Sequence, residues 1–210
     1  MGILIFLAVW DILKTFGIFF FLRHRMSKIM EFIKTTLSGA YIIKPKVFWD
    51  ERGFFLESYS EKTFAENGIK AKFVQDNHSL SSKKGILRGL HFQNPPNAQA
   101  KLARVTQGKV YDVIVDLRKD SETFGKWESF ELSAKNFQML FIPRGFAHAF
   151  LTLEDNTEFM YKVDDFYASE SDSGIIWNDP DLAIDWPIKN PILSDKDSKL
   201  QFFKDFESPF

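Results

Sequence analysis

The amino-acid sequence predicts an all-β domain, either a sandwich or a closed barrel, rather than an α/β fold. Three observations predict this class. From about Ser38 onward, short segments alternate apolar and polar residues, turn signals separate these segments, and long helical patterns do not intervene. A chain of 210 residues without repeats or linkers is long enough to bury one good-sized core. We therefore expect one β domain over 31–210, preceded by an apolar, helical extension over 1–30.

The extension has the composition of a membrane segment but carries charges. Residues 3–22 contain 14 Leu, Ile, Val or Phe, and Asp11 and Lys14 interrupt them. On the membrane-insertion scale the apolar residues contribute about −4 to −8 kcal/mol and the two charges return about +5 to +7 kcal/mol. No small-residue cleavage site follows, which disfavours a signal peptide. Three interpretations stay open: a true start at Met26 or Met30, a membrane anchor over 3–22, or a packed helix.

The strands are predicted in order from their alternation and the turns between them. In KVYDVIVDL, Tyr111, Val113 and Val115 share one face at period two, which indicates a half-buried strand. The other predicted strands are Tyr41–Ile43, Phe54–Ser58, Phe73–Asn77, Lys101–Thr106, Lys126–Leu132, Met139–Ile142, Ala147–Leu153 and Glu158–Val163. A helix is predicted over Ser60–Gly68, with a serine N-cap and an Asn-Gly stop. The tail over 181–210 should pack across the outside of the domain.

Charge and cysteine content restrict the possible partners. The net charge of −1 predicts no general attraction to nucleic acid or to anionic membranes. The chain contains no cysteine, which excludes disulfides and thiolate metal sites and fits a cytoplasmic location. Any metal would need carboxylates together with the four histidines, which are His24, His78, His91 and His148.

The segment GILRGLHFQ places Arg88 and His91 in an otherwise apolar, strand-like run. In a regular strand these two side chains face opposite sides, because their positions differ in parity. A bulge at Gly89 would add one residue and bring both onto the same face. The residues alone leave a structural histidine and a catalytic one equally open.

Two further segments are ambiguous in the same way. QDNHS over 75–79 places five hydrogen-bonding side chains in a row, and about half of them should face inward, where an unpartnered polar group costs a few kcal/mol. A solvated strand and a ligand-lined interior both fit this pattern. Lys101 in AKLARV is either an exposed strand lysine or a charged group of a site.

The spacing P-x-G-x-x-H in IPRGFAHAF, over 142–150, is similar to the second metal motif of cupin barrels. The full cupin metal set also needs an H-x-H pair with a following carboxylate. Here the corresponding strand has His91 and Gln93, so the second imidazole is missing. Two histidines without a nearby glutamate make a poor divalent site, and we predict no metal.

Seven segments in a fixed order carry a more specific resemblance. They are VFWDERGFFLES, FVQDNHS, GILRGLHFQ, AQAKLARV, GKVYDVIVDLRKDSETFGKW, IPRGFAHAF and FMYKVDDFY…GIIWNDP. Together they resemble the dTDP-4-dehydrorhamnose 3,5-epimerase family, over roughly 41–197. The resemblance implies a cupin-like double-stranded β-helix, a jelly-roll barrel with a few short helices. It also implies a homodimer, a dTDP-sugar substrate and no cofactor.

The implied reaction inverts C3 and C5 of dTDP-4-dehydro-6-deoxy-D-glucose to give dTDP-4-dehydro-L-rhamnose, a step in the biosynthesis of dTDP-L-rhamnose for cell-surface polysaccharide. The C4 ketone acidifies the protons on both carbons, because their removal gives an enolate. Two groups on opposite sides of the ring exchange these protons without a redox cofactor. A single-site 3- or 5-epimerase, a metal-dependent cupin enzyme and a non-catalytic sugar-nucleotide-binding module stay open as alternatives.

The resemblance also assigns roles to residues. His91 matches the general base, Asp197 its carboxylate partner and Tyr161 the proton donor on the opposite face. Lys101 matches the cation near the ketone oxygen, where negative charge develops. Substrate-binding positions are matched by Arg52, Phe55, Glu57, Gln75, Asn77, Arg88, His148, Asp172 and Lys196.

The chain departs from the family pattern near the expected mouth of the pocket. Phe166 stands where a tyrosine is common, Ala168-Ser169 replaces a residue-Pro pair, and Asp172 stands where glutamate is frequent. These departures leave the proposed base and acid intact, but the choice between double and single epimerisation stays open. For the dimer, we expect the segment Tyr41–Ile43 to provide an edge strand.

Overall fold

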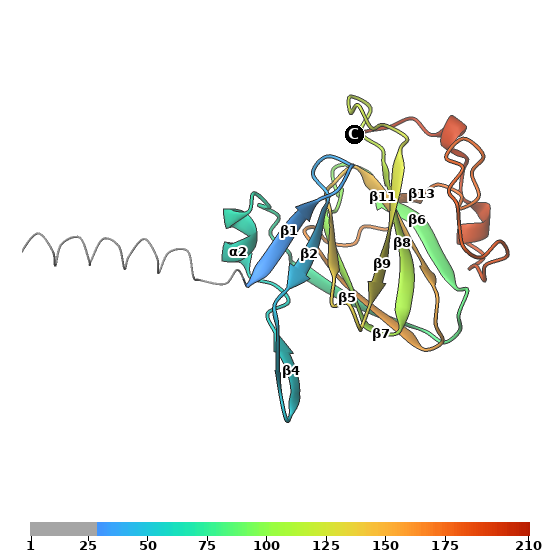
Figure 1. Ribbon diagram of the computed structural model, residues 1–210. Coiled ribbons are helices and arrows are strands. Elements are labelled where there is room, and N and C mark those ends of the chain that lie inside the picture. The colour runs from blue at the N-terminus through green and yellow to red at the C-terminus, as the bar shows by residue number, and fades with distance from the viewer. Residues whose placement is uncertain (1–28) are drawn as a thin grey trace, which may run out of the picture. The chain divides into compact units, whose positions relative to one another are not determined.

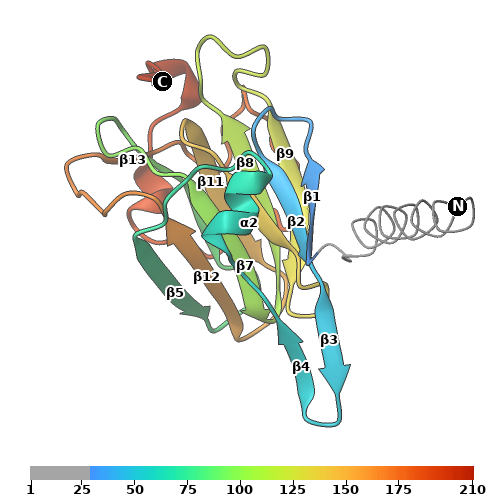
Figure 2. The same ribbon diagram turned by 90° about the vertical axis from the view of Figure 1, so that its left-hand side faces the viewer.

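Two β-sheets packed face to face form most of the computed structural model, which describes residues 29–210 (Figures 1 and 2). The six-stranded sheet has the order β1 (Met30–Lys34), β2 (Tyr41–Pro45), β10 (Met139–Ile142), β7 (Lys101–Gln107), β12 (Thr157–Val163) and β5 (Gln75–Ser81). The five-stranded sheet has the order β13 (Asp172–Gly174), β6 (Leu87–Gln93), β11 (Phe146–Thr152), β8 (Lys109–Asp116) and β9 (Trp127–Ser133). The all-β prediction is confirmed, and the arrangement fits a cupin-like jelly roll.

Each predicted strand overlaps an observed one, and Met139–Ile142 coincides with β10. The sequence pattern missed β1, β3 (Val47–Asp50) and β13, which are too short to show a clear alternation. The expectation that Tyr41–Ile43 provides an edge strand is wrong. This segment lies in β2, which pairs with β1 on one side and β10 on the other within the same chain.

The core lies on both faces of the five-stranded sheet. Between the two sheets, Ile114 of β8 packs with Phe150 of β11 and Phe159 of β12. On the outer face, Val113 and Val115 of β8 pack against the C-terminal tail. The prediction of a half-buried strand is therefore wrong for β8, because the tail covers the face that would otherwise meet water.

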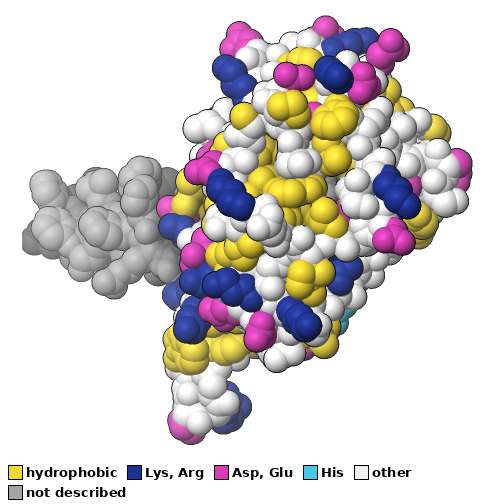
Figure 3. All heavy atoms as spheres, turned by 90° about the vertical axis from the view of Figure 1, so that its right-hand side faces the viewer, with side chains coloured by type: hydrophobic (Ala, Val, Ile, Leu, Met, Phe, Trp, Pro, Cys, Tyr) yellow, Lys and Arg dark blue, Asp and Glu magenta, His cyan; other side chains and the backbone are white. Residues whose placement is uncertain are grey.

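The tail after β13 packs across the outside of the five-stranded sheet, as predicted. Leu182 and Trp186 are buried there, and Phe203 and Phe206 pack against the same cluster. Two short 3₁₀ helices, η1 (Asp197–Lys199) and η2 (Phe203–Asp205), belong to this tail. Figure 3 faces the side of the molecule where the tail lies, and hydrophobic side chains show there between charged ones.

The helix predicted over Ser60–Gly68 is confirmed as α2 (Glu61–Glu66). The Ser60 side chain accepts a hydrogen bond from the Thr63 N–H, which caps the first turn. Gly68, at φ +89°, follows the last turn in the left-handed region that glycine adopts without strain. Before this helix, β3 and β4 (Gly53–Leu56) form a hairpin that projects from the sandwich (Figures 1 and 2).

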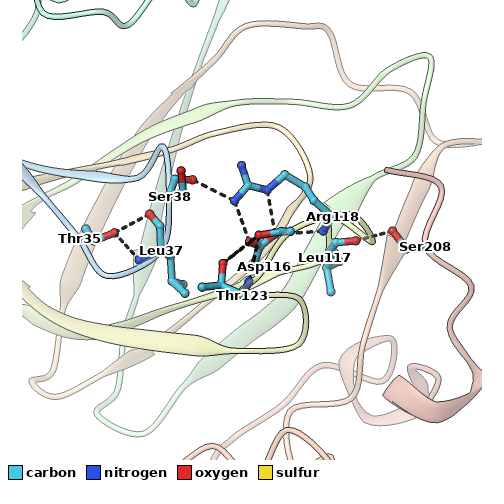
Figure 4. Close-up of polar contacts among 9 residues, drawn as sticks. Thr35, Leu37, Ser38, Asp116, Leu117, Arg118, Thr123 and Ser208 are labelled. Carbon is cyan, nitrogen blue, oxygen red and sulfur yellow. Dashed lines mark hydrogen bonds and ion pairs between the residues drawn. The ribbon is translucent and has the colours of Figure 1, made fainter.

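A hydrogen-bonded cluster organises the loop after β8 (Figure 4). The Asp116 carboxylate is fully buried and accepts hydrogen bonds from Arg118 (backbone N, Nε and Nη2), Ser121 Oγ and Thr123 Oγ1. The Arg118 guanidinium also donates to the Ser38 carbonyl at 2.9 Å and lies over the Phe146 ring. This cluster therefore joins the start of the loop to the chain before β2.

By its internal contacts, Glu31–Phe210 forms one compact unit. None of the helices within 29–210 is long and apolar enough to cross a membrane. The apolar segment over 3–22 lies outside the described residues, so the helical extension and its possible role as an anchor stay predictions. The cytoplasmic location is likewise a prediction.

Candidate active site

A cavity of about 540 Å³ opens between the two sheets, within the size range of small-molecule sites. Its wall combines ionisable and polar side chains with an apolar part formed by residues such as Phe150 and Phe159. Eight of the residues predicted for the site line it: Asn77, Arg88, His91, Lys101, His148, Tyr161, Lys196 and Asp197. The structure thus brings together residues that the sequence separates by up to 120 positions.

The predicted bulge at Gly89 is confirmed, and it determines which side chains of β6 face the cavity. His91 pairs with His148 and Arg88 pairs with Phe150, so three residue steps on β6 match two on β11. Arg88 and His91 consequently face the same side. A Cβ at Gly89 (φ +117°) would lie 2.5 Å from the His148 carbonyl oxygen, so only glycine fits there.

His91 is held by a carboxylate from the tail. Its Nε2 lies 2.6 Å from Asp197 Oδ1, and the Asp197 side chain is 5% exposed against 31% for His91. Burial raises the pKa of Asp197, but hydrogen bonds from His91, the Gly89 N–H and Ser194 outweigh it and leave the pKa below its usual value. An ionised Asp197 accepts the Nε2 hydrogen, which leaves His91 Nδ1 free to take a proton.

Lys101 approaches His91 from the opposite sheet. It is the first residue of β7, it is 9% exposed, and its Nζ donates to the His91 carbonyl at 3.4 Å. Burial lowers its pKa to about 8, although Asp112 and then Asp172 oppose that shift. Lys101 is therefore still mostly an ammonium ion at neutral pH, and it is weakly hydrated.

Tyr161 stands on the opposite wall from His91. It lies on β12 of the six-stranded sheet, where it pairs with Asn77 of β5, whereas His91 belongs to the five-stranded sheet. Burial is the largest cause that raises the pKa of Tyr161, and the Arg88 cation partly opposes it. The phenol thus keeps its proton at neutral pH. An imidazole and a phenol face one cavity from its two sides.

The sequence patterns missed Asp112, which reaches the site from inside the sandwich. Asp112 lies on β8 and is fully buried, with His148 Nε2 at 2.9 and 3.1 Å from its two carboxylate oxygens. The alternation of residues along the strand could have found it, because Asp112 lies two residues before the apolar Ile114 and therefore shares its face. That face is buried against the six-stranded sheet, whereas the tail covers the opposite face of β8.

The mouth of the cavity has its own polar contacts. Lys196 forms an ion pair with Asp172, which also accepts a hydrogen bond from the Tyr167 hydroxyl at 3.1 Å. Gln75 donates to Asn77 and accepts from the Tyr167 N–H. Asp172 and Gln75 therefore lie at the rim, each in contact with a residue that lines the cavity.

Three predicted binding residues lie apart from this cavity. Arg52 is at the turn of the β3–β4 hairpin, where it pairs with Asp50. Phe55, also on the hairpin, is 70% exposed. Glu57 follows the hairpin, and its Oε1 is buried without a hydrogen-bond partner within the described residues. None of the three lines the cavity of its own chain.

The position of a second cupin imidazole is taken by Gln93, whose amide is engaged elsewhere. Its Nε2 donates to the carbonyls of Asn97 and Phe166, and its Oε1 accepts from the Ala168 N–H. Gln93 thus joins two loops to β6. Over residues 29–210, no group of three or more His, Asp or Glu side chains is placed to hold a metal ion.

Comparison with known proteins gives one consistent result. The family model described as dTDP-4-dehydrorhamnose 3,5-epimerase matches residues 34–205. A Shigella flexneri protein of that name is 54% identical over 177 residues, which cover 84% of this chain and 97% of the relative.

Two solved structures give the same picture. The Bacillus anthracis enzyme, with TDP and PPi bound, is similar with a TM-score of 0.81 and 53% identity, over 82% of this chain and 99% of that one. The Legionella pneumophila 3,5-epimerase, in complex with dTDP-4-keto-L-rhamnose, has a TM-score of 0.81 and 45% identity, over 85% and 95%.

Proposed function

The chain belongs to the dTDP-4-dehydrorhamnose 3,5-epimerase family, and from this premise we propose how its cavity carries out the reaction. The protein is an isomerase that converts dTDP-4-dehydro-6-deoxy-D-glucose to dTDP-4-dehydro-L-rhamnose in rhamnose biosynthesis. The observation that supports the roles proposed below is the placement of His91 and Tyr161 on opposite walls of one cavity, with Lys101 beside them.

Proton removal is assigned to His91. Its Nδ1 accepts a proton from C3 or C5 of the sugar, and the resulting imidazolium is stabilised by the ionised Asp197 carboxylate at Nε2. Asp197 fixes the tautomer and the ring orientation, so the tail takes part in the site.

Proton return is assigned to Tyr161. Removal of the C–H proton leaves an enolate whose charge is greatest on the C4 oxygen, where Lys101 supplies an ammonium group. The phenol then donates its proton to the carbon from the face opposite His91, which inverts the centre. Before the second carbon is inverted, and again before the next turnover, His91 releases its proton to solvent and the Tyr161 oxygen regains one.

Binding of the nucleotide is assigned to the cations and amides around the cavity. Arg88 and Lys196 carry positive charge suited to the diphosphate, and a guanidinium can bind phosphate oxygens in a bidentate manner. His148 offers its free ring edge from the cavity wall. Gln75 and Asn77 offer amide groups near the rim.

A homodimer is also proposed, and the β3–β4 hairpin supports it. The hairpin projects from the sandwich and exposes large aromatic side chains, namely Phe48 (46%), Trp49 (67%), Phe54 (54%) and Phe55 (70%). A second copy that inserts its hairpin at the cavity mouth would bury these side chains. It would also bring Arg52, Phe55 and Glu57 to a substrate that they do not reach within their own chain.

The assembly is tested by sedimentation equilibrium of the purified protein. We expect a dimer, and we expect Phe55→Ala to raise the KM for the dTDP-sugar more than it lowers kcat, because it removes a contact from the partner's site. A fully active monomer would contradict the proposed assembly.

The reaction is tested by deuterium incorporation. The purified protein is incubated with dTDP-4-dehydro-6-deoxy-D-glucose in D₂O, and the label at C3 and C5 is followed by NMR. Label at both carbons is expected, label at one carbon would support a single-site epimerase, and no label would exclude catalysis on this substrate.

Variants tested in the same assay distinguish the role of His91 from that of Tyr161. His91→Asn should slow exchange at both carbons by at least about 10²-fold while dTDP still binds. Tyr161→Phe should retain exchange but lose inversion at C5, whereas the control Tyr111→Phe, on the outer face, should behave as wild type. Normal inversion in Tyr161→Phe would place the donor elsewhere.

A further inference from the structure

Two imidazoles lie side by side on the inner face of the five-stranded sheet, and each is held by its own aspartate. His91 of β6 and His148 of β11 are direct register partners. Asp197 reaches His91 from the tail, whereas Asp112 reaches His148 from β8 inside the sandwich. The first pair takes part in the proposed proton transfer. The His148–Asp112 pair takes no part in that proton transfer.

Asp112 is an unusually placed carboxylate. It is 0% exposed, and within the described residues its hydrogen-bond partner is the His148 imidazole alone. A charge in such a place is costly unless a positive group compensates it. The groups that oppose the effect of burial on the Asp112 pKa are the His148 imidazole, at hydrogen-bond distance, and the Lys101 ammonium.

Asp112 and Lys101 each shift the pKa of the other. Burial is the largest influence on Lys101 and lowers its pKa, and Asp112 is the strongest of the groups that oppose this, ahead of Asp172. The ionisable side chains around Lys101 come from every element that borders the cavity. They are His78, Arg88, His91, Asp112, His148, Tyr161, Asp172, Lys196 and Asp197.

We propose that Asp112 is a positioning residue of the epimerase. From inside the sandwich it fixes the His148 imidazole and supplies the negative charge against which Lys101 stays an ammonium ion at the cavity wall. Asp112 does not line the cavity and does not touch the substrate. This inference rests on the proposed function, because the charge of Lys101 matters for turnover only where an enolate develops beside it.

The test is the pH profile of kcat/KM in Asp112→Asn. In the wild type, kcat/KM should fall as the pH rises through about 8, where Lys101 loses its proton. Without the Asp112 charge, this basic limb should move to lower pH by about one unit. At pH 8 the ammonium fraction of Lys101 should then fall from about one half to about one eleventh, so the loss in kcat/KM should be about fivefold.

The matched control is Asp116→Asn, the same substitution on the same face of β8, four residues away. It should lower the melting temperature but leave the basic limb near pH 8. A loss of packing alone in Asp112→Asn would lower the activity without moving the limb. An unmoved limb in Asp112→Asn therefore overturns the proposal.

A second variant and a direct measurement cover the case in which Asp112→Asn does not fold. Asp112→Leu keeps the branching at Cγ and has no polar side-chain atoms. NMR of ε-¹³C-lysine reports the titration of Lys101 without requiring turnover. Lys101 should titrate at lower pH in either neutral variant than in the wild type. If both neutral variants unfold while Asp112→Glu folds, Asp112 serves the fold and the proposal fails. Deuterium exchange by the wild type separately reports whether the proposed reaction occurs.

Discussion

Asp112 and Asp116 lie on the same face of the same strand, and both are 0% exposed, yet their surroundings differ. The Asp112 carboxylate is bonded only to His148 within the described residues. The Asp116 carboxylate accepts hydrogen bonds from three neighbours along the chain: Arg118, Ser121 and Thr123. The same strand thus carries a poorly compensated carboxylate next to His148 of the cavity wall and a fully compensated one beside the loop after β8.

The pKa values of the two carboxyls reflect this difference. At Asp116, burial favours the neutral acid, but the hydrogen bonds of Arg118, Ser121 and Thr123 outweigh it and hold the pKa at about 2. At Asp112, burial prevails and the pKa is raised. The number of donors, rather than burial, decides whether a buried carboxylate stabilises the fold. Incomplete compensation is typical of a functional site.

Removal of the cation at the cavity should have the largest effect. Lys101→Met should lower kcat by about 10²- to 10³-fold, because it removes a preorganised charge near the developing enolate oxygen. The melting temperature should also fall, because the buried Asp112 loses one of its two compensating groups. Steady-state kinetics and thermal unfolding check both statements. The control Lys109→Met, on the same sandwich but paired with Glu131 at the surface, should leave kcat unchanged.

Removal of the Asp116 charge, beside the loop after β8, should lower the stability of the protein but not its kcat. Asp116→Asn should lower the free energy of unfolding by about 3 kcal/mol, because Arg118 loses its buried partner. The kcat measured well below the melting temperature should stay within about twofold of wild type. Urea unfolding and the epimerase assay measure the two quantities. A large loss of kcat with normal stability would remove the contrast between the two ends of β8.

The acid dependence of stability should also be traceable to Asp116. Its pKa is depressed in the folded state, so its stabilisation is complete above the ordinary value of 3.8 and is lost as the pH falls toward about 2. The contribution is about 2 kcal/mol. Unfolding free energies at pH 5, 4 and 3 should therefore fall less steeply in Asp116→Asn than in the wild type. Parallel curves for the two proteins would contradict this assignment.

A single donor to Asp116 should have the smallest effect. Thr123→Val preserves the side-chain shape and removes one hydrogen bond to the carboxylate, so it should cost about 1.5 kcal/mol. Thr106→Val is a suitable control, because Thr106 contacts a partly exposed glutamate at 3.3 Å and its loss should cost under about 0.5 kcal/mol. Urea unfolding of both variants would show whether the donors to Asp116 act individually.

The strand pattern and the tail could be predicted from the sequence, but the two faces of β8 could not. The alternation in KVYDVIVDL correctly located the strand, but it made the face of Asp112 and Asp116 look solvated. Only the packing of the tail against Val113 and Val115 shows that both faces are buried. Short strands such as β13 are likewise set by pairing with a neighbour rather than by local pattern.

Some features of the candidate site could likewise be predicted from the sequence, and others could not. The bulge at Gly89 followed from local chemistry, and it placed Arg88 and His91 together as expected. The contact of Asp197 with His91 spans 106 positions and was indicated only by family resemblance. The hairpin residues Arg52 and Phe55 could not be located relative to the cavity, because the alternation of residues does not show that the β3–β4 hairpin projects away from the sandwich.

The most direct test of the contrast along β8 is an NMR titration of ¹³C-carboxyl-labelled aspartate in the wild-type protein, with Asp112→Asn and Asp116→Asn used to assign the two signals. The Asp116 carboxyl should remain ionised at pH 3, while the Asp112 carboxyl should take up its proton above the ordinary aspartate value of 3.8. Coincident titration of the two signals, or protonation of Asp116 at the higher pH, would contradict the account.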